Sequence, residues 1–189
     1  MKKIILFASG SGSNAEIIIR HFQENKTIKV VKVYTNNPFA KVIDRANGLN
    51  VPVEIFTRQE FEGVNIAEKL LHDAPDIIVL AGFLWKFPEI IINKFPNKII
   101  NIHPALLPKY GGKGMYGMYV HQSVLDNKEK ETGITIHFVN ENYDEGGILF
   151  QKSINILECT SADEIAEKVH GLEHQYFSEV IESFLIKNK

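Results

Sequence analysis

Apolar and polar positions along the chain follow two patterns that alternate from the N-terminus onward. Short continuous apolar runs are typical of strands covered on both faces, whereas longer stretches with apolar positions three and four apart are typical of helices. The apolar runs predict strands at 3–8, 29–34, 53–56, 76–81 and from residue 98 onward. The longer stretches predict helices at 14–23, 40–48, 59–72 and 88–93. This alternation predicts a doubly wound, mostly parallel sheet.

The pattern changes after residue 112. A helix is predicted at 116–127, followed by two runs rich in β-branched residues at 133–139 and 148–156. The link between these runs is too short for a crossover helix, so they are expected to pair antiparallel. A long helix at 161–185 closes the chain. The sequence therefore predicts an α/β fold with a mixed sheet, organised as one domain over residues 1–189.

Composition and charge exclude several classes of partner and location. The chain has 21 basic and 23 acidic residues, a net charge of −2, which gives no basic field for nucleic acid. Its one cysteine, Cys159, excludes an internal disulfide and fits a cytoplasmic protein. No apolar run approaches the roughly 20 residues of a membrane span. The apolar stretch at 4–8 is too short for a signal peptide.

A loop rich in glycine and serine connects the first strand to the first helix: Ser9-Gly10-Ser11-Gly12-Ser13-Asn14. Glycines allow a sharp turn and close approach to a ligand, and the helix start offers free N–H groups to an anion. A phosphate group fits this loop. The alternative is that Ser13 or Asn14 simply caps the helix.

The same loop also matches a loose dinucleotide fingerprint. Such a site needs an acidic residue at the end of the second strand to hold the ribose. Here that end reads Tyr34-Thr35-Asn36-Asn37 and has no carboxylate. A single phosphate therefore fits better than NAD.

Asn101 and His103 lie two residues apart on the strand that begins near residue 98, so they point to one face of the sheet. Pro104 keeps His103 in extended backbone. The C-terminal ends of strands in open α/β sheets bind ligands. The two side chains are therefore candidate hydrogen-bond donors to a substrate. The alternative is a polar pair satisfied locally at the strand end.

Asp144 follows the first of the two late strands. If those strands extend the sheet beside the strand of Asn101, Asp144 approaches His103. The carboxylate is then expected to orient the imidazole, raise its pKa and favour the cation. The alternative is a solvated acidic residue in a surface turn.

An aromatic segment at 82–87 follows another strand and is expected to border the same site. Its side chains suit a flat heterocycle, or else pack on the core as an aromatic loop. His121 and His137 are predicted to be structural or solvated, and Cys159 inert. No residues show the spacing of a metal site, so no metal is expected.

Taken together, these motifs resemble the glycinamide ribonucleotide formyltransferase family of purine synthesis. The resemblance spans essentially the whole chain and is strongest at 9–14, 79–83, 101–110 and Asp144. It implies transfer of a formyl group from 10-formyltetrahydrofolate, as co-substrate, to the amino group of glycinamide ribonucleotide. The products are formylglycinamide ribonucleotide and tetrahydrofolate. It also implies small-molecule substrates only, and a monomer or homodimer.

The resemblance assigns roles to individual residues. It makes 1–97 a phosphate-binding half and 98–189 a folate-binding and catalytic half. The catalytic residues are Asn101, His103 and Asp144. The ribonucleotide-binding residues are Gly12, Ser13, Asn14, His170 and Glu173. The folate-binding residues are Leu84, Trp85, Lys86, Phe87, Asn101, Asn140, Glu141, Asn142, Tyr143 and Asp144.

Three features depart from the family pattern, and one family residue has only a candidate match. Trp85 stands where an arginine is common, and His170 stands where a glutamine contacts the substrate. The segment 111–116 replaces a shorter loop containing Pro-Gly. Arg58 is a candidate for an arginine that contacts the folate.

Four other functions are compatible with these residues. Relatives with the same Asn-x-His and Asp hydrolyse formylfolate or formylate methionyl-tRNA or sugar nucleotides, but they generally carry a further domain and lack this phosphate loop. A non-catalytic nucleotide-binding module would use the glycine loop alone. It would leave Asn101, His103 and Asp144 without a role.

Overall fold

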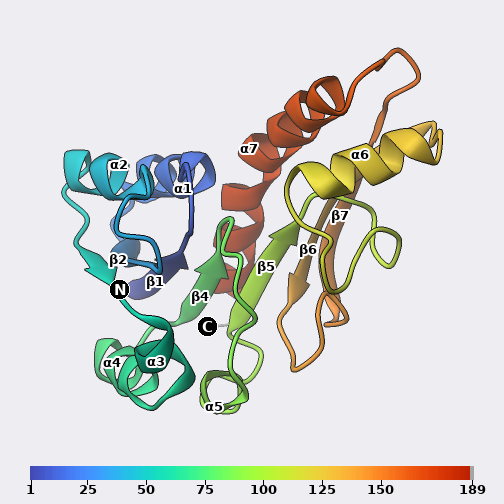
Figure 1. Ribbon diagram of the computed structural model, residues 1–189. Coiled ribbons are helices and arrows are strands. Elements are labelled where there is room, and N and C mark those ends of the chain that lie inside the picture. The colour runs from blue at the N-terminus through green and yellow to red at the C-terminus, as the bar shows by residue number, and fades with distance from the viewer. Residues whose placement is uncertain (188–189) are drawn as a thin grey trace.

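The computed structural model describes residues 1–187, so the last two residues of the predicted second half lie outside the described part. Seven strands form one sheet in the order β3-β2-β1-β4-β5-β6-β7 (Figure 1). The strands are β1 (Lys2–Phe7), β2 (Ile28–Thr35), β3 (Val53–Ile55), β4 (Ile77–Leu80), β5 (Ile99–His103), β6 (Glu131–Phe138) and β7 (Ile148–Asn155). The helices are α1 (Ser13–Phe22), α2 (Val42–Gly48), α3 (Arg58–Glu62), α4 (Asn65–Asp73), α5 (Glu89–Ile92), α6 (Met118–Asp126) and α7 (Ala162–Lys187).

The sheet is mixed, as the sequence predicts. Strands β1 to β5 pair in parallel, whereas β5 with β6 and β6 with β7 pair antiparallel. The chain proceeds outward from β1 to β2 and β3, then returns to the other side of β1 as β4. The order of the strands therefore reverses between β1 and β4. Such a switch point leaves a crevice at the C-terminal ends of the strands, where ligands bind in this architecture.

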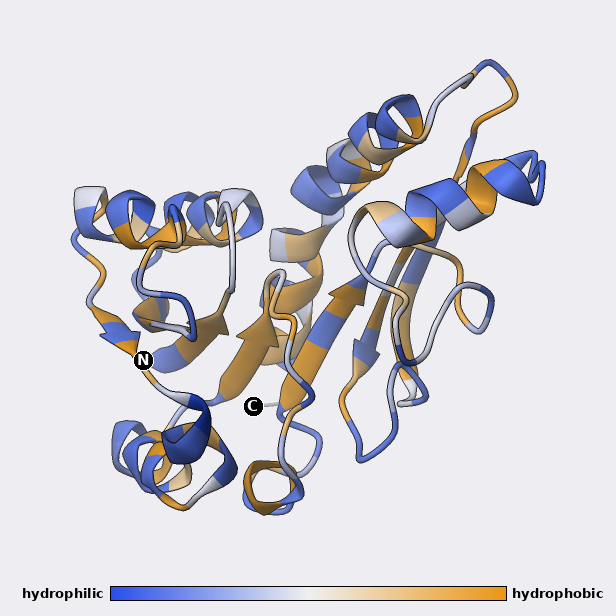
Figure 2. Ribbon diagram, viewed as in Figure 1, coloured by the Kyte–Doolittle hydropathy of each residue, from blue (hydrophilic) through white to orange (hydrophobic). Residues whose placement is uncertain are grey.

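Two apolar cores cover the two faces of the sheet. Ile4 and Leu6 of β1 join one core, whereas Ile5 and Phe7 join the other, because successive side chains on a strand point to opposite faces. Helices α1, α2, α6 and α7 supply the first core, and α3, α4 and α5 supply the second. Figure 2 shows the apolar central strands between helices whose outer sides are polar.

The prediction of a single helix at 59–72 is wrong in one respect, because this segment forms two helices. Helix α3 begins at a capping box in which Thr57 and Glu60 bond each other's backbone N–H groups. It ends at Gly63, whose backbone is extended (φ −85°, ψ −160°), and α4 starts two residues later. Glycine carries a high entropic cost inside a helix, so the chain breaks there. The other elements lie within two residues of their predicted bounds.

No helix in the described part of the chain combines the length and the apolar composition that a membrane span requires.

Candidate active site

One cleft lies at the C-terminal ends of β1, β4 and β5, beside the switch point of the sheet. The loops that follow β1 and β4 are tied together there: Ser9 N–H donates to the Gly82 carbonyl (3.0 Å), and Leu84 N–H donates to Ser9 Oγ (3.1 Å). The cleft is lined by all the predicted site residues except Glu141: Gly12, Ser13, Asn14, Leu84, Trp85, Lys86, Phe87, Asn101, His103, Asn140, Asn142, Tyr143, Asp144, His170 and Glu173. Glu141 is exposed and lies outside the lining.

The glycine loop places the start of α1 at the cleft. Gly12 is the N-cap residue of α1 and has a left-handed backbone (φ +73°). A Cβ at this position would lie 2.5 Å from Cβ of Val42 in α2, so only glycine fits without a shift. Within the described part of the chain no side chain caps α1, which overturns the alternative that Ser13 or Asn14 is a simple cap. Instead, Asn14 Nδ2 donates to Glu173 Oε2 on α7 (2.8 Å).

Asn101 is held by a cross-strand neighbour that the sequence reasoning assigned no functional role. In the register of β5 and β6, Asn101 lies opposite His137, and Asn101 Nδ2 donates to His137 Nε2 (3.2 Å). His137 Nδ1 is 2.9 Å from the Phe138 carbonyl, so Nδ1 carries the proton and Nε2 accepts. His137 is buried and lines the cleft, so it is not solvated. Among residues 1–187, the second N–H of the Asn101 amide has no such partner and is available to a ligand.

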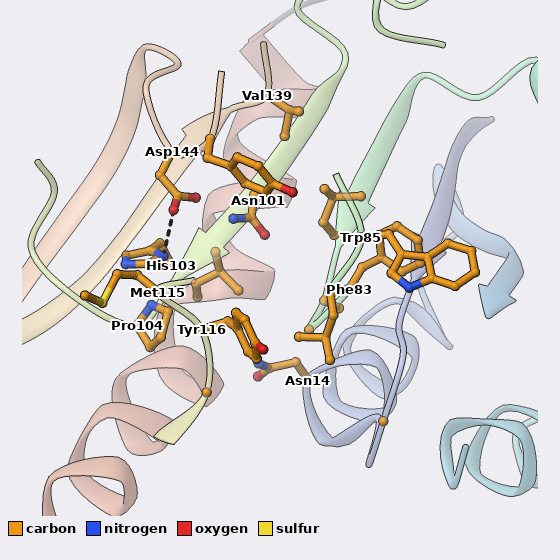
Figure 3. Close-up of a pocket in the computed structure, with 18 of the residues that line it drawn as sticks. Asn14, Phe83, Trp85, Asn101, His103, Pro104, Met115, Tyr116, Val139 and Asp144 are labelled. Atoms are coloured by element: carbon orange, nitrogen blue, oxygen red, sulfur yellow. Dashed lines mark ion pairs between the residues drawn. The ribbon is translucent and has the colours of Figure 1, made fainter. Parts of the chain in front are cut away.

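His103 and Asp144 meet in the cleft, as predicted for late strands that extend the sheet. His103 Nδ1 lies 3.6 Å from Asp144 Oδ2, the ion pair dashed in Figure 3. On the other side of the ring, His103 Nε2 donates to the Tyr110 carbonyl (2.7 Å). The neutral ring therefore carries its proton on Nε2 and presents Nδ1 as an acceptor beside the carboxylate.

The expectation that Asp144 raises the pKa of His103 above its usual value is wrong. Burial lowers the pKa of His103 below 6.5, and this effect exceeds the opposing effects of the Asp144 charge and the Tyr110 carbonyl. The ring is only 3% exposed, so the cation is poorly solvated. In the free protein at neutral pH, His103 is therefore neutral rather than cationic.

Asp144 is fixed by three groups on different segments. Its Oδ2 accepts from Gly112 N–H (2.9 Å), and its Oδ1 lies 3.5 Å from His137 Nε2. Burial by itself raises the pKa of Asp144, but the positive charge that His137 and His103 carry when protonated, together with the Gly112 amide, holds it below its usual value. The carboxylate is therefore ionised at neutral pH, facing the neutral His103.

The other end of the cleft carries Glu173 and two histidines. Glu173 is buried, and burial raises its pKa against the opposing effects of Asn14 and His170. His170 is exposed, and its ring centroid lies 6.4 Å from that of His121. His121 is 2% exposed and lines the cleft, so it is buried rather than solvated. No motif or spacing marks His121 in the sequence; its position becomes evident only when α6 packs against α7.

The aromatic segment after β4 divides between core and cleft. Phe83 and Phe87 are buried against Phe7, which agrees with the core interpretation, whereas Leu84 is 55% exposed at the mouth. Across the cleft, Lys86 Nζ lies 5.8 Å from the centre of the Tyr143 ring. The two segments predicted to hold a folate therefore face each other.

Arg58 is not part of the cleft lining. Its guanidinium lies 5.1 Å from the centre of the Trp85 ring and pairs with Glu62 (2.7 Å). It therefore contacts the cleft only through Trp85. Among residues 1–187, no group of three or more His, Cys, Asp or Glu side chains is arranged to hold a metal ion.

Comparison with known proteins agrees with this geometry at the level of the family. The profile of the family described as formyl transferase matches residues 2–181, nearly the whole chain. The chain therefore belongs to the formyl transferase family.

Several similar proteins carry a narrower name. Phosphoribosylglycinamide formyltransferase of Bacillus subtilis (strain 168) is 35% identical over 192 residues, covering 98% of this chain and 95% of the relative. The chloroplastic phosphoribosylglycinamide formyltransferase of Arabidopsis thaliana is 36% identical over 187 residues, but the chain spans only 64% of that relative's length. The crystal structure of phosphoribosylglycinamide formyltransferase from Bacillus halodurans superposes with a TM-score of 0.89 at 28% identity, covering 100% and 97% of the two chains.

Proposed function

We propose that this chain transfers the formyl group of 10-formyltetrahydrofolate to the amino group of glycinamide ribonucleotide, a step of purine synthesis. One observation carries the proposal: Asn101, His103 and Asp144, remote in the sequence, converge in a cleft that also contains the start of α1. A group-transfer site and an anion-binding helix start in one cleft suit a phosphorylated acceptor.

The ribonucleotide is proposed to lie between α1 and α7. The free N–H groups at the start of α1 suit its phosphate, and Gly12, Ser13 and Asn14 lie closest to that helix end. Glu173 and His170 on α7 border the same end of the cleft. Holding the phosphate far from the reacting atoms fixes the approach of the amine to the formyl carbon.

The folate is proposed to lie between the segment after β4 and the segment before Asp144. Leu84, Trp85, Lys86 and Phe87 supply one wall, and Asn140, Glu141, Asn142 and Tyr143 supply the other. Apolar side chains and loop backbone groups suit a flat ring with a polar edge. When bound, the folate supplies the activated formyl group. Glu141 is the weakest member of this set because its side chain lies outside the lining.

Asn101 is proposed to stabilise the negative charge that gathers on the formyl oxygen. Its amide is oriented by His137, which leaves one N–H for that oxygen. A donor placed in this way contributes about 3 kcal/mol to transition-state stabilisation.

His103 is proposed to move the proton. As the bond from the amine to the formyl carbon forms, the neutral Nδ1 of His103 accepts the proton that the amine loses. Asp144 stabilises the imidazolium so formed. The Nδ1–H of His103 then becomes a second hydrogen-bond donor at the site, in addition to Asn101. The proton then passes to the folate nitrogen as the bond from that nitrogen to the formyl carbon breaks.

The organisation of the chain is part of the proposal. We retain a phosphate-binding half at 1–97 and a folate-binding and catalytic half at 98–189, with the cleft drawing residues from both. The chain is expected to work in the cytoplasm on small molecules alone, with no nucleic acid, as a monomer or homodimer.

Incubation of the purified protein with both substrates tests the function. We expect free tetrahydrofolate to accumulate only when the ribonucleotide is present. Release of tetrahydrofolate without the ribonucleotide would instead favour a formylfolate hydrolase. Binding of the ribonucleotide with no release would favour a nucleotide-binding module and contradict the proposal.

A further inference from the structure

His103 lies between two hydrogen-bond acceptors, but a neutral imidazole donates to only one of them. Its Nδ1 lies 3.6 Å from Asp144 Oδ2, and its Nε2 lies 2.7 Å from the Tyr110 carbonyl. A carboxylate beside Nδ1 by itself favours a proton on that nitrogen. A ring with its proton on Nδ1 cannot accept a second proton there from a substrate amine. The Tyr110 carbonyl, as the closer acceptor, therefore decides which tautomer the site contains.

The position of the Tyr110 carbonyl depends on an uncommon backbone conformation. Tyr110 has φ +57°, in the left-handed region that a bulky residue rarely adopts. Such a conformation persists only where the surrounding structure holds it in place. Two residues further along the chain, Gly112 N–H donates to Asp144 Oδ2 (2.9 Å). The segment 110–112 thus contacts both His103 and Asp144, so whatever fixes this segment also fixes the pair.

The side chain of Tyr110 anchors this segment to the loop after α6. Its O–H donates to Glu129 Oε1 (2.9 Å), and Lys109 Nζ donates to the same oxygen (2.8 Å). Burial and the Glu129 carboxylate raise the pKa of Tyr110 to about 12, whereas Lys109 and Tyr110 hold the pKa of Glu129 below its usual value. At neutral pH the phenol is therefore the donor and the carboxylate the acceptor. Glu129 N–H in turn donates to the Val124 carbonyl of α6 (3.3 Å).

We propose that Tyr110 and Glu129 are positioning residues for the proton transfer. The bond between the phenol and the carboxylate holds the segment 110–112, and through it the Tyr110 carbonyl keeps Nδ1 of His103 free to accept a proton. The inference rests on the proposed function, because it concerns the proton acceptor of that reaction.

The two side chains act at a distance from the substrates. Within the described part of the chain, the residues that line the cleft include neither Tyr110 nor Glu129. Their only route to the reacting atoms is the backbone of the segment 110–112. The inference therefore predicts an effect on kcat and on the state of the His103 ring, and none on the binding of either substrate.

NMR of the ring nitrogens of His103 measures the tautomer directly and needs no substrate. In the wild type at neutral pH we expect the proton on Nε2. Tyr110→Phe keeps the aromatic ring but removes the O–H, so the Tyr110 carbonyl is held less firmly. In this variant a measurable share of the protein should carry the proton on Nδ1 instead, beside Asp144. Glu129→Ala should give the same shift.

Steady-state kinetics of formyl transfer give a second measurement. Tyr110→Phe and Glu129→Ala should each lower kcat about three- to tenfold, the size expected for one lost hydrogen bond, with both KM values unchanged. The double variant should be no slower than either single variant, because both act through one bond. Glu129→Gln keeps an oxygen that accepts from the phenol and should restore most of kcat.

Glu131→Ala is the matched control. It removes the same kind of carboxylate two residues further along the chain, from a side chain that is exposed and lies outside the cleft lining. It should keep the tautomer and the kcat of the wild type.

Three results would overturn the inference: a proton on Nδ1 in the wild type, an unchanged tautomer in Tyr110→Phe, or a loss of kcat in Glu129→Ala that Glu129→Gln does not restore. If Glu129→Ala does not fold, the tautomer in Tyr110→Phe decides, since that variant lacks a single oxygen atom. The tautomer is measured without formyl transfer, so the expected tautomers in a wild type that transfers no formyl group would contradict the proposed function only.

Discussion

The protonation state of His103 decides how the proposed chemistry proceeds. Its Nε2 proton is committed to the Tyr110 carbonyl, so Nδ1 is the only nitrogen that can exchange a proton with a substrate. Burial favours the neutral ring at rest, and Asp144 favours the cation. A group balanced in this way can accept a proton during the reaction and return it later, which a permanently charged imidazolium cannot do.

A titration of the His103 ring by NMR in the free protein measures this balance. We expect a midpoint below pH 6.5, because burial lowers the pKa of His103. Asp144→Asn should move the midpoint lower still, since it removes the charge that stabilises the cation. A wild-type midpoint above pH 7 would make the cation the resting form and contradict the proposed proton path.

At this scale the sequence revealed only part of the site. Asn101 and His103 share a strand, so their spacing alone places them on one face. The pairing of Asn101 with His137 depends on the register of β5 and β6, which no local pattern records. The lowered pKa of His103 depends on how deeply the ring is buried, which the neighbouring residues in the sequence do not indicate.

Among the elements, the glycine loop couples the first helix to the second. Gly12 starts α1 in a left-handed conformation, and the space that a Cβ would need is filled by Val42 of α2. In addition, Val42 N–H donates to the Gly10 carbonyl (3.2 Å). The position of α2 therefore sets the shape of the loop that is proposed to receive the phosphate.

Gly12→Ala should damage both stability and binding. The left-handed backbone and the contact with Val42 predict a loss of about 1–3 kcal/mol in the free energy of unfolding. The KM for the ribonucleotide should rise about tenfold or more, while the KM for formyltetrahydrofolate changes little.

The matched control is Gly48→Ala, because Gly48 lies on α2 with open space where a Cβ would be added. It should leave both KM values unchanged. Unchanged ribonucleotide binding in a folded Gly12→Ala protein, or a loss confined to the folate, would show that the loop is not the phosphate site.

Element types and order were predictable from periodicity, including the antiparallel β6 and β7. The break at Gly63 was not, because the flanking residues continue a helical pattern across it. Glycine weakens a helix at that point, but the break also depends on tertiary packing, because α3 buries Phe61 and α4 buries Ile66, Ala67 and Leu70 in the same core.

For the whole molecule, the reversal of strand order between β1 and β4 creates the cleft, and burying histidines in it has a cost at acid pH. Burial lowers the pKa values of His103 and His121 below 6.5. Between pH 6.5 and about 4, the unfolded chain therefore binds more protons than the folded one, and stability falls as pH falls. The raised pKa of Glu173 opposes this effect, but it is a single group.

Urea unfolding at pH 7 and pH 5 measures the effect. We expect a lower free energy of unfolding at pH 5, and a smaller drop in His121→Phe, because that variant lacks one of the groups that must charge on unfolding. His72→Gln is the control, since its side chain is 92% exposed and should not alter the drop. A free energy of unfolding equal at both pH values would contradict the assignment.

The most direct test of the whole account is the rate of formyl transfer by Asp144→Asn with both substrates saturating. Asparagine keeps the shape of the side chain but removes the charge that stabilises a protonated His103. We expect kcat to fall about 100- to 1000-fold, roughly 3–4 kcal/mol, with unchanged circular dichroism and unchanged Kd for the ribonucleotide. A folded Asp144→Asn protein that transfers the formyl group at a near wild-type rate would contradict the account.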